Sequence, residues 1–207
     1  FYEPSTRTRM SFESAMKRLG GGVLNLGEIN STSVAKGESL YDTIRVTDGY
    51  GDIIVLRHPM EGAALFADSI SSAPVINGGD GSGRHPTQTL LDLATINTAH
   101  GRLDVDIVLA GDLRYGRTVH SLARALARFN ARIILSNPEP LAIPNEVLLD
   151  VKERGGTIEF QHDLSTAVKD ADVVYMTRIQ RERFPDDDEY EKVAGTFRLH
   201  LDDLNQV

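Results

Sequence analysis

The sequence predicts an α/β protein made of two doubly wound parallel-sheet domains linked by a helix. Short apolar runs rich in Val and Ile alternate with amphipathic stretches, and Gly, Pro, Asp or Asn residues bound each run. This alternation is typical of a parallel sheet covered by helices. The expected strands are residues 23–27, 52–57, 74–77, 106–111, 131–136, 157–161 and 172–176.

Two apolar stripes at helical spacing predict helices that pack against these sheets. The first stripe comprises Phe12, Ala15, Met16 and Leu19. The second stripe comprises Val119, Leu122, Ala123, Leu126 and Phe129. Three glycines at positions 20–22 follow the first stripe, where a left-handed residue is expected to end the helix. We interpret both stripes as core positions.

A long helical stretch from Pro86 to about His100 separates two series of strands and helices. We therefore expect two domains, residues 1–100 and residues 101–207, with a ligand cleft where the strand ends of both domains face each other. The acidic run at residues 186–189 is expected to be a solvated loop or a helix start, rather than a metal site.

Composition excludes several classes of protein. The 207 residues are 41% hydrophobic and 25% charged, as in an ordinary soluble chain. No apolar run reaches the ~20 residues of a membrane span and no export signal is evident, so we expect a cytoplasmic protein with no membrane partner. The absence of cysteine excludes disulfides and thiolate chemistry. A net charge of −8 argues against nucleic acid as a partner, so an anionic ligand must be held by local cationic clusters.

The first candidate cluster is residues 5–9 (STRTR), which directly precede the first apolar stripe. Ser or Thr at a helix start can cap backbone N–H groups, and the same N–H groups with the hydroxyls and the helix dipole can bind an anion. Arg7 would add positive charge. A capped helix with solvated arginines explains the same residues, and the stretch alone does not decide between the two.

The second candidate cluster is residues 85–88 (HPTQ), which start the long helix after a glycine-rich loop at residues 78–83. A histidine there can donate a hydrogen bond to a carbonyl oxygen. A glutamine can recognise an amide, because its side chain both donates and accepts hydrogen bonds. Arg57 stands at the carboxyl end of an expected strand, where open α/β sheets bind ligands. A purely structural role for the His-Pro pair is the alternative.

Two further clusters follow strands of the second domain, at residues 111–117 (GDLRYGR) and 178–180 (RIQ). Neither is a Walker loop or a G-x-G-x-x-G fingerprint, so nucleotide binding is unsupported. Arginines from neighbouring strands could instead hold the two carboxylates of a small dicarboxylic acid by bidentate pairing. Each arginine singly could also form a surface ion pair.

Together these pieces resemble the aspartate and ornithine transcarbamoylase family over essentially the whole chain. The S-T-R-T-R and H-P-T-Q stretches match the two carbamoyl-phosphate motifs that the family shares. Residues 111–121 (GDLRYGRTVHS) and 176–184 (MTRIQRERF) are similar to the aspartate branch. The ornithine branch would carry a cysteine where Thr87 stands, and an S-M-G stretch that this sequence lacks.

The resemblance implies an enzyme that transfers the carbamoyl group of carbamoyl phosphate to L-aspartate in pyrimidine synthesis. Thr8, Arg57 and His85 would point at the carbonyl oxygen, where donors stabilise the negative charge that develops as an amine attacks. With Arg7 they are the implied catalytic residues, and Gln88 would orient the carbamoyl NH₂. The implied carbamoyl-phosphate site comprises Ser5, Thr6, Arg7, Thr8, Arg57, His85 and Gln88.

For the second substrate, the resemblance implies that Arg117, Arg178 and Gln180 hold the carboxylates of aspartate and present its α-amine to the carbonyl carbon. Ser33 and Lys36 match a serine and a lysine that the family takes from the neighbouring subunit, and Lys36 would also contact aspartate. A homotrimer with shared active sites is therefore implied, and some members bind separate regulatory chains. Neither a metal nor an organic cofactor is implied.

The sequence departs from the family pattern at both ends. Members carry a strand and a helix before the first motif, and an H-P-L-P loop and a returning helix after the last residue of this chain. We therefore expect these residues to be the central part of a longer chain, which alone folds or catalyses poorly. Two competing hypotheses are a transcarbamoylase for another amine, which residues 178–180 argue against, and an inactive scaffold domain, which the intact motifs argue against.

Overall fold

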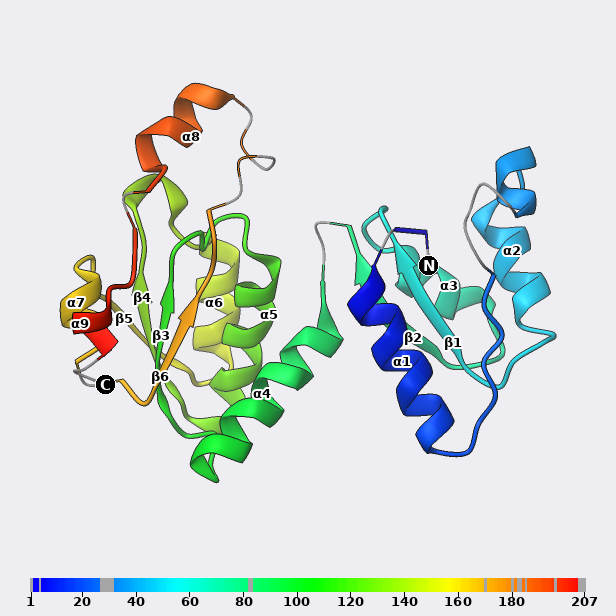
Figure 1. The fold of residues 1–207 in the computed structure, drawn as a ribbon, viewed down its shortest axis with the longest axis horizontal. Helices are drawn as coiled ribbons and strands as arrows, with labels where there is room; N and C mark the ends of the chain where they lie inside the picture. The colour runs from blue at the N-terminus through cyan, green and yellow to red at the C-terminus, as the bar shows by residue number, and fades with distance from the viewer. Residues whose placement is uncertain are drawn as a thin grey trace. The chain divides into compact units, whose positions relative to one another are not determined.

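The computed structural model describes residues 2–3, 5–26, 32–81, 84–169, 171–179, 181, 184, 186–195 and 197–204 (Figure 1). The chain divides into two compact units, residues 1–87 and 88–207. Each unit is built on a parallel sheet, so the predicted fold class is confirmed. The assignment of separate functions to residues 1–100 and 101–207 stays a prediction. In the described part of the chain, no helix is long and apolar enough to cross a membrane.

The first unit contains a two-stranded parallel sheet of β1 (Ile54–His58) and β2 (Val75–Asp80), with α3 (Ala63–Ile70) connecting the strands. Two further helices, α1 (Thr6–Arg18) and α2 (Leu40–Thr47), precede the sheet. Side chains of β1 are alternately buried and half-buried, and the buried ones pack against α2 and α3. The core of this unit comprises Ile44, Ile54, Leu56, Ala63 and Ala67.

The carboxylate of Asp48, directly after α2, holds the turn that leads into β2. It accepts hydrogen bonds from the backbone N–H groups of Ser72 and Ala73, at 2.9 and 2.8 Å, and from the Ser71 hydroxyl at 2.6 Å. These bonds, that of Ser71 first, hold the pKa of Asp48 well below its usual range. The ionised carboxylate is therefore part of what fixes the start of β2.

The predicted strand at residues 23–27 is wrong for the described residues 23–26, which form no strand. Val23, Leu24 and Leu26 are 39%, 79% and 52% exposed. The β1–β2 sheet has no third strand among the described residues, so this apolar run lacks the neighbour that strand pairing requires. Gly27 lies outside the described residues.

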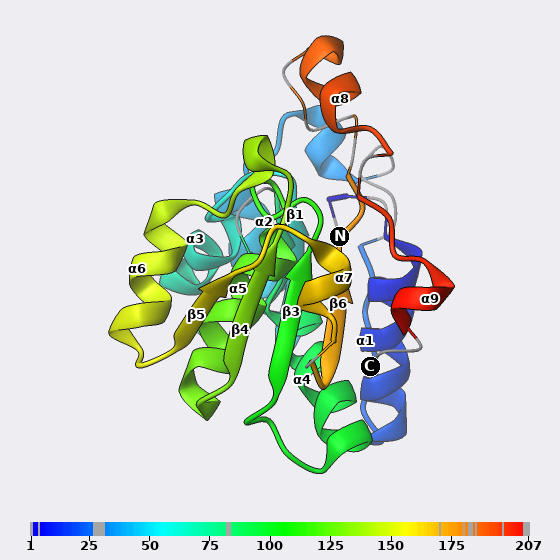
Figure 2. The same ribbon diagram turned by 90° about the vertical axis from the view of Figure 1, so that its left-hand side faces the viewer.

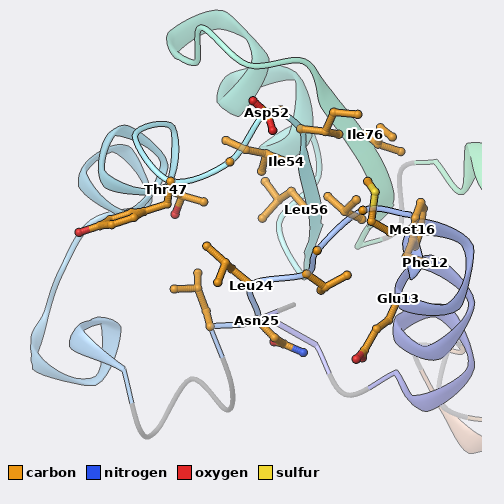
Figure 3. A pocket seen from close by; sticks show the side chains of 18 of the residues that line it. Phe12, Glu13, Met16, Leu24, Asn25, Thr47, Asp52, Ile54, Leu56 and Ile76 are labelled. Carbon is orange, nitrogen blue, oxygen red and sulfur yellow. The ribbon is translucent and has the colours of Figure 1, made fainter. Parts of the chain in front are cut away.

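The first apolar stripe also differs from its prediction, because α1 has no buried residue. Phe12 and Met16 are half-buried, whereas Ala15 and Leu19 are exposed. All four line a largely apolar cavity of about 920 Å³. In Figure 3, Phe12 and Met16 of α1 lie across this cavity from Leu24 and from Leu56 of β1. Helical spacing identified the apolar face, but in the described part of the chain none of its four residues is buried. Gly20 does end the helix in the left-handed region, as predicted (φ 84°).

The second unit contains a four-stranded parallel sheet in the order β5-β4-β3-β6. All four strands lie within predicted runs, and β2 extends three residues beyond its predicted end, into the glycine-rich stretch. The strands of the second unit are β3 (Asp106–Ala110), β4 (Arg132–Ser136), β5 (Thr157–Phe160) and β6 (Val173–Met176). The central strand β3 is buried on both faces, which explains its continuous apolar run.

Helices cover both faces of this sheet (Figures 1 and 2). On one face pack α4 (Pro86–His100), α5 (Arg117–Leu126) and α6 (Asn145–Glu153). On the other face pack α7 (Leu164–Ala167) and residues 197–199. The remaining helices are α8 (Asp187–Val193), where Asp186 caps the predicted acidic helix start, and α9 (Leu201–Leu204).

The second stripe is confirmed as core for its first four members, which are at most 1% exposed. Phe129 is the exception, at 40% exposed. It lies after α5 has tightened into the 3₁₀ turn Ala127–Phe129, whose different periodicity turns this position away from the sheet.

The strand order reverses at β3, which pairs with β4 on one side and with β6 on the other. In open α/β sheets such a reversal leaves a crevice beyond the carboxyl ends of the strands, and ligands bind there. Gly111 follows β3 at φ 99°, and a side chain there would overlap the carbonyl oxygen of Thr177, which follows β6. Glycine therefore permits the two connections to touch at this reversal point.

We predict that Gly111→Ala separates these connections and destabilises the second unit. The control is Gly155→Ala, because Gly155 also has positive φ (83°) but nothing lies within 4 Å of an added Cβ. The control should lose about 1 kcal/mol from backbone strain alone, and Gly111→Ala about 1–3 kcal/mol more from overpacking. Urea unfolding of both variants measures the difference, and equal losses would contradict the proposed close contact.

We also predict that Asp48→Asn lowers the melting temperature at pH 7. The difference in melting temperature between this variant and the unsubstituted protein should shrink as the pH falls below about 4. Because the pKa of Asp48 is lowered in the folded state, its contribution is complete above its unfolded pKa, about 4, and is lost as the pH falls through the lower folded value. Thermal melts between pH 7 and pH 3 test this. A gap that does not change with pH would show that charge is irrelevant at this turn.

Candidate functional site

Two predicted site residues, Arg57 and His85, meet at the carboxyl end of the β1–β2 sheet. Arg57 Nη1 donates to the Gly78 carbonyl oxygen at 3.0 Å and lies 3.4 Å from His85 Nε2. Arg57 Nη2 pairs with the Glu3 carboxylate at 3.0 Å. The Arg57 side chain is 12% exposed, and its Nε is buried without a hydrogen-bond partner among the described residues. A cation and an imidazole therefore share one small polar site.

The loop after β2 gives His85 this position. Asp80 is buried, and its carboxylate accepts from the backbone N–H groups of Gly62 at 3.1 Å and of Arg84 at 2.7 Å. Gly79 has φ 121°, and a Cβ there would lie 2.7 Å from Arg57 Nη1. A larger residue would therefore push the guanidinium away from the strand end. In the sequence, this stretch stands out only by its glycines.

The start of α1 lies beside Arg57. The Tyr2 N–H donates to the Arg57 carbonyl oxygen at 2.7 Å, and Glu3 pairs with the Arg57 side chain. Ser5 occupies the N-cap position of α1, but its side chain makes no cap hydrogen bond. The side-chain cap that the capped-helix alternative expects is therefore absent at Ser5, but the exposure of Arg7 and Arg9 is what that alternative expects. Thr6 and Arg7 are exposed and Thr8 is half-buried.

Glu3 was not identified from the sequence. An acidic residue two positions before a motif rich in hydroxyls and arginines was the signal that could have found it. Its carboxylate pairs with Nη2 of the Arg57 guanidinium at 3.0 Å. Glu3 therefore neutralises part of the charge that Arg57 would offer to a phosphate.

In the second unit, two predicted cationic residues follow the paired strands β3 and β6. Arg117 begins α5 and is half-buried, and Arg178 follows β6 and is exposed. Thr177 joins the two connections. Its N–H donates to the Ala110 carbonyl oxygen at 2.8 Å, and its hydroxyl oxygen lies 3.2 Å from the carbonyl oxygen of Asp112. Both arginines thus stand at the edge of the sheet where the strand order reverses. Gln180 lies outside the described residues.

Gln88, one turn into α4, is held by residues that the sequence analysis missed. Its Nε2 donates to Asp92 Oδ1 at 2.9 Å, and the Tyr175 hydroxyl donates to Asp92 Oδ2 at 3.1 Å. Burial raises the pKa of Asp92 and also that of Tyr175. The spacing of Gln88 and Asp92, four residues apart on a helix, was the available signal.

The remaining predicted residues lie on the 3₁₀ turn Ser33–Lys36, where both terminal side chains are exposed. None of the predicted site residues that the structure describes lines the apolar cavity of Figure 3. Among the described residues, no group of three His, Asp or Glu side chains is arranged to hold a metal ion. The predicted polar sites at the strand ends are therefore separate from this apolar cavity.

Two family models match the chain, one in each part of it. Residues 1–98 match the family model described as the carbamoyl-phosphate-binding domain of aspartate/ornithine carbamoyltransferase. Residues 103–205 match the Asp/Orn-binding domain of the same family. The chain is 57% identical over 201 residues to the aspartate carbamoyltransferase catalytic subunit of Thermococcus gammatolerans, covering 97% of this chain and 65% of the relative. It is 57% identical over 208 residues to that of Archaeoglobus fulgidus, covering 100% and 68%.

Solved structures show the same similarity. The catalytic subunit of M. jannaschii aspartate transcarbamoylase superposes with a TM-score of 0.83 at 56% identity, over 93% of this chain and 64% of that one. The Trypanosoma cruzi aspartate transcarbamoylase in complex with carbamoyl phosphate superposes with a TM-score of 0.89 at 39% identity, over 100% and 68%. This sequence thus spans about two thirds of the length of its relatives. At this identity and coverage, the chain belongs to the aspartate/ornithine carbamoyltransferase family.

Proposed function

We propose that the protein transfers the carbamoyl group of carbamoyl phosphate to L-aspartate, giving N-carbamoyl-L-aspartate and phosphate. The observation that carries this proposal is the meeting of Arg57 and His85 at the end of β1, beside the start of α1, in a member of this family. Further support comes from relatives named as aspartate carbamoyltransferase catalytic subunits, and from the Trypanosoma cruzi enzyme, whose structures hold carbamoyl phosphate and aspartate.

In the proposed carbamoyl-phosphate site, Arg57 and residues Ser5 to Thr8 bind the phosphate through charge, hydroxyls and the helix start. Thr8, Arg57 and His85 donate to the carbonyl oxygen. These donors stabilise the oxyanion that forms when the α-amine attacks the carbonyl carbon. The carbon–oxygen bond to phosphate then breaks and inorganic phosphate leaves, so no covalent enzyme intermediate is required.

In the proposed aspartate site, Arg117, Arg178 and Gln180 bind the two carboxylates. The support from the described residues is that Arg117 and Arg178 follow strands paired directly with each other, Ala110 opposite Met176. Two guanidinium groups delivered to one sheet edge suit a dicarboxylic acid, because each can form a bidentate pair with one carboxylate. Holding both carboxylates limits the orientations available to the α-amine.

The proposed assembly is a homotrimer in which Ser33 and Lys36 reach the active site of a neighbouring subunit. Its support is the resemblance to the family together with the exposure of both side chains on a projecting 3₁₀ turn. The name catalytic subunit, carried by the relatives, is consistent with separate regulatory chains as further partners.

We predict that Arg7→Ala in the complete gene-encoded protein lowers kcat/KM for carbamoyl phosphate by about 10–100-fold, the value of one or two charged hydrogen bonds. Arg18→Ala is the matched control, because Arg18 is an exposed arginine in the last turn of the same helix. Phosphate release under saturating aspartate measures both variants. Full activity of Arg7→Ala would contradict the proposed phosphate site.

We predict that Arg178→Lys raises KM for aspartate by about tenfold or more with little change in KM for carbamoyl phosphate. Lysine keeps the charge but loses the planar fork that pairs with a carboxylate. Arg154→Lys is the control, because Arg154 forms a surface ion pair with Asp150 at 3.2 Å. If the unsubstituted protein carbamoylated ornithine but not aspartate, it would be a transcarbamoylase for another amine and the proposed function would be wrong.

A further inference from the structure

The carboxylate of Asp92 is bound from two sides by residues of different elements. Gln88 of α4 binds one oxygen and Tyr175 of β6 binds the other, at 2.9 and 3.1 Å. A chain of polar contacts therefore runs from the H-P-T-Q motif, through Asp92, to β6, the strand that Arg178 follows.

This arrangement determines which way the amide of Gln88 faces. The amide presents its NH₂ group to Asp92 Oδ1, which accepts the hydrogen bond. The amide oxygen of Gln88 is then directed to the opposite side. Tyr175 holds Asp92 in turn, in the way that a second group commonly orients a functional side chain.

We propose that Asp92, anchored by Tyr175, is a positioning residue that fixes the Gln88 amide with its oxygen toward the carbamoyl NH₂ of the substrate. The inference rests on the proposed function, because it assigns Gln88 to the carbamoyl group. Its consequence is selectivity: the site distinguishes an acyl phosphate that carries NH₂ from one that carries a methyl group in the same place.

A role in helix stability alone explains the contacts less well. A Gln–Asp pair four residues apart stabilises an exposed helix by only a few tenths of a kcal/mol. Asp92 is instead half-buried, and the burial that raises its pKa opposes the ionised form. A role in helix stability also does not explain the hydrogen bond from Tyr175 of β6 to Asp92, because these two residues lie 83 positions apart in the chain.

The test compares carbamoyl phosphate with acetyl phosphate, which replaces the NH₂ group by a methyl group. Dissociation constants of both are measured by calorimetry on the complete protein and its variants, without aspartate. In Asp92→Asn the residue facing Gln88 can donate as well as accept, so the amide is free to turn over. Carbamoyl phosphate should bind about tenfold more weakly and acetyl phosphate about equally, as expected for the loss of one hydrogen bond.

Two further variants separate positioning from folding. Tyr175→Phe leaves both members of the Gln88–Asp92 pair in place and should reduce the preference for carbamoyl phosphate by about threefold. Asp92→Glu restores an acceptor-only carboxylate and should recover part of the preference that Asp92→Asn loses. The control is Asp150→Asn, which removes a carboxylate paired with Arg124 and Arg154 on the surface of the same unit. It should leave the preference unchanged even if the melting temperature falls.

Equal weakening of both acyl phosphates in Asp92→Asn and Tyr175→Phe, or no change in either, would overturn the inference. Failure of the proposed function has a different signature. If the unsubstituted protein does not carbamoylate aspartate but the variants still lose selectivity, the acceptor is wrong and the role of Asp92 stands.

Discussion

Parallel strand pairing is the constraint on which the rest of this structure depends. Because β1 pairs parallel to β2, and β3 parallel to β4 and β6, the carboxyl end of every strand in a unit lies at the same edge of its sheet. Residues far apart in sequence are therefore delivered together. Arg57 and His85 meet at one such edge although 28 positions separate them, and Arg117 and Arg178 stand at the other.

Charge is arranged locally in a protein whose overall balance would repel its proposed substrates. The chain carries a net charge of −8, and both substrates are anions. Arg57 is nearly buried, so its charge must be satisfied by nearby groups, here the Gly78 carbonyl oxygen and Glu3. A site built in this way holds its cation in place before the ligand arrives, and an anionic ligand takes over part of an existing interaction.

The two units differ in how completely their helices are packed. In the second unit, α5 buries its apolar stripe against β3 and β4, which gives a continuous core on that face of the sheet. In the first unit, the corresponding stripe of α1 borders an open apolar cavity. The same helical periodicity therefore produced a correct core prediction in one case and a wrong one in the other. Periodicity shows which face of a helix is apolar, but whether that face is covered depends on what packs against it.

Several features could be predicted from the sequence alone. They are the α/β class, six of the seven expected strands, the long helix α4 and the motif residues proposed to bind the substrates. Those features are encoded locally, in the alternation of apolar runs, in glycine and proline at their ends, and in motifs of four or five residues. Only the tertiary structure decided that Glu3 pairs with Arg57, that Gly111 lets Thr177 approach, and that Asp92 joins Gln88 to Tyr175. These partners are brought together by strand order and register, which cannot be deduced from the residues that flank each contact in the sequence.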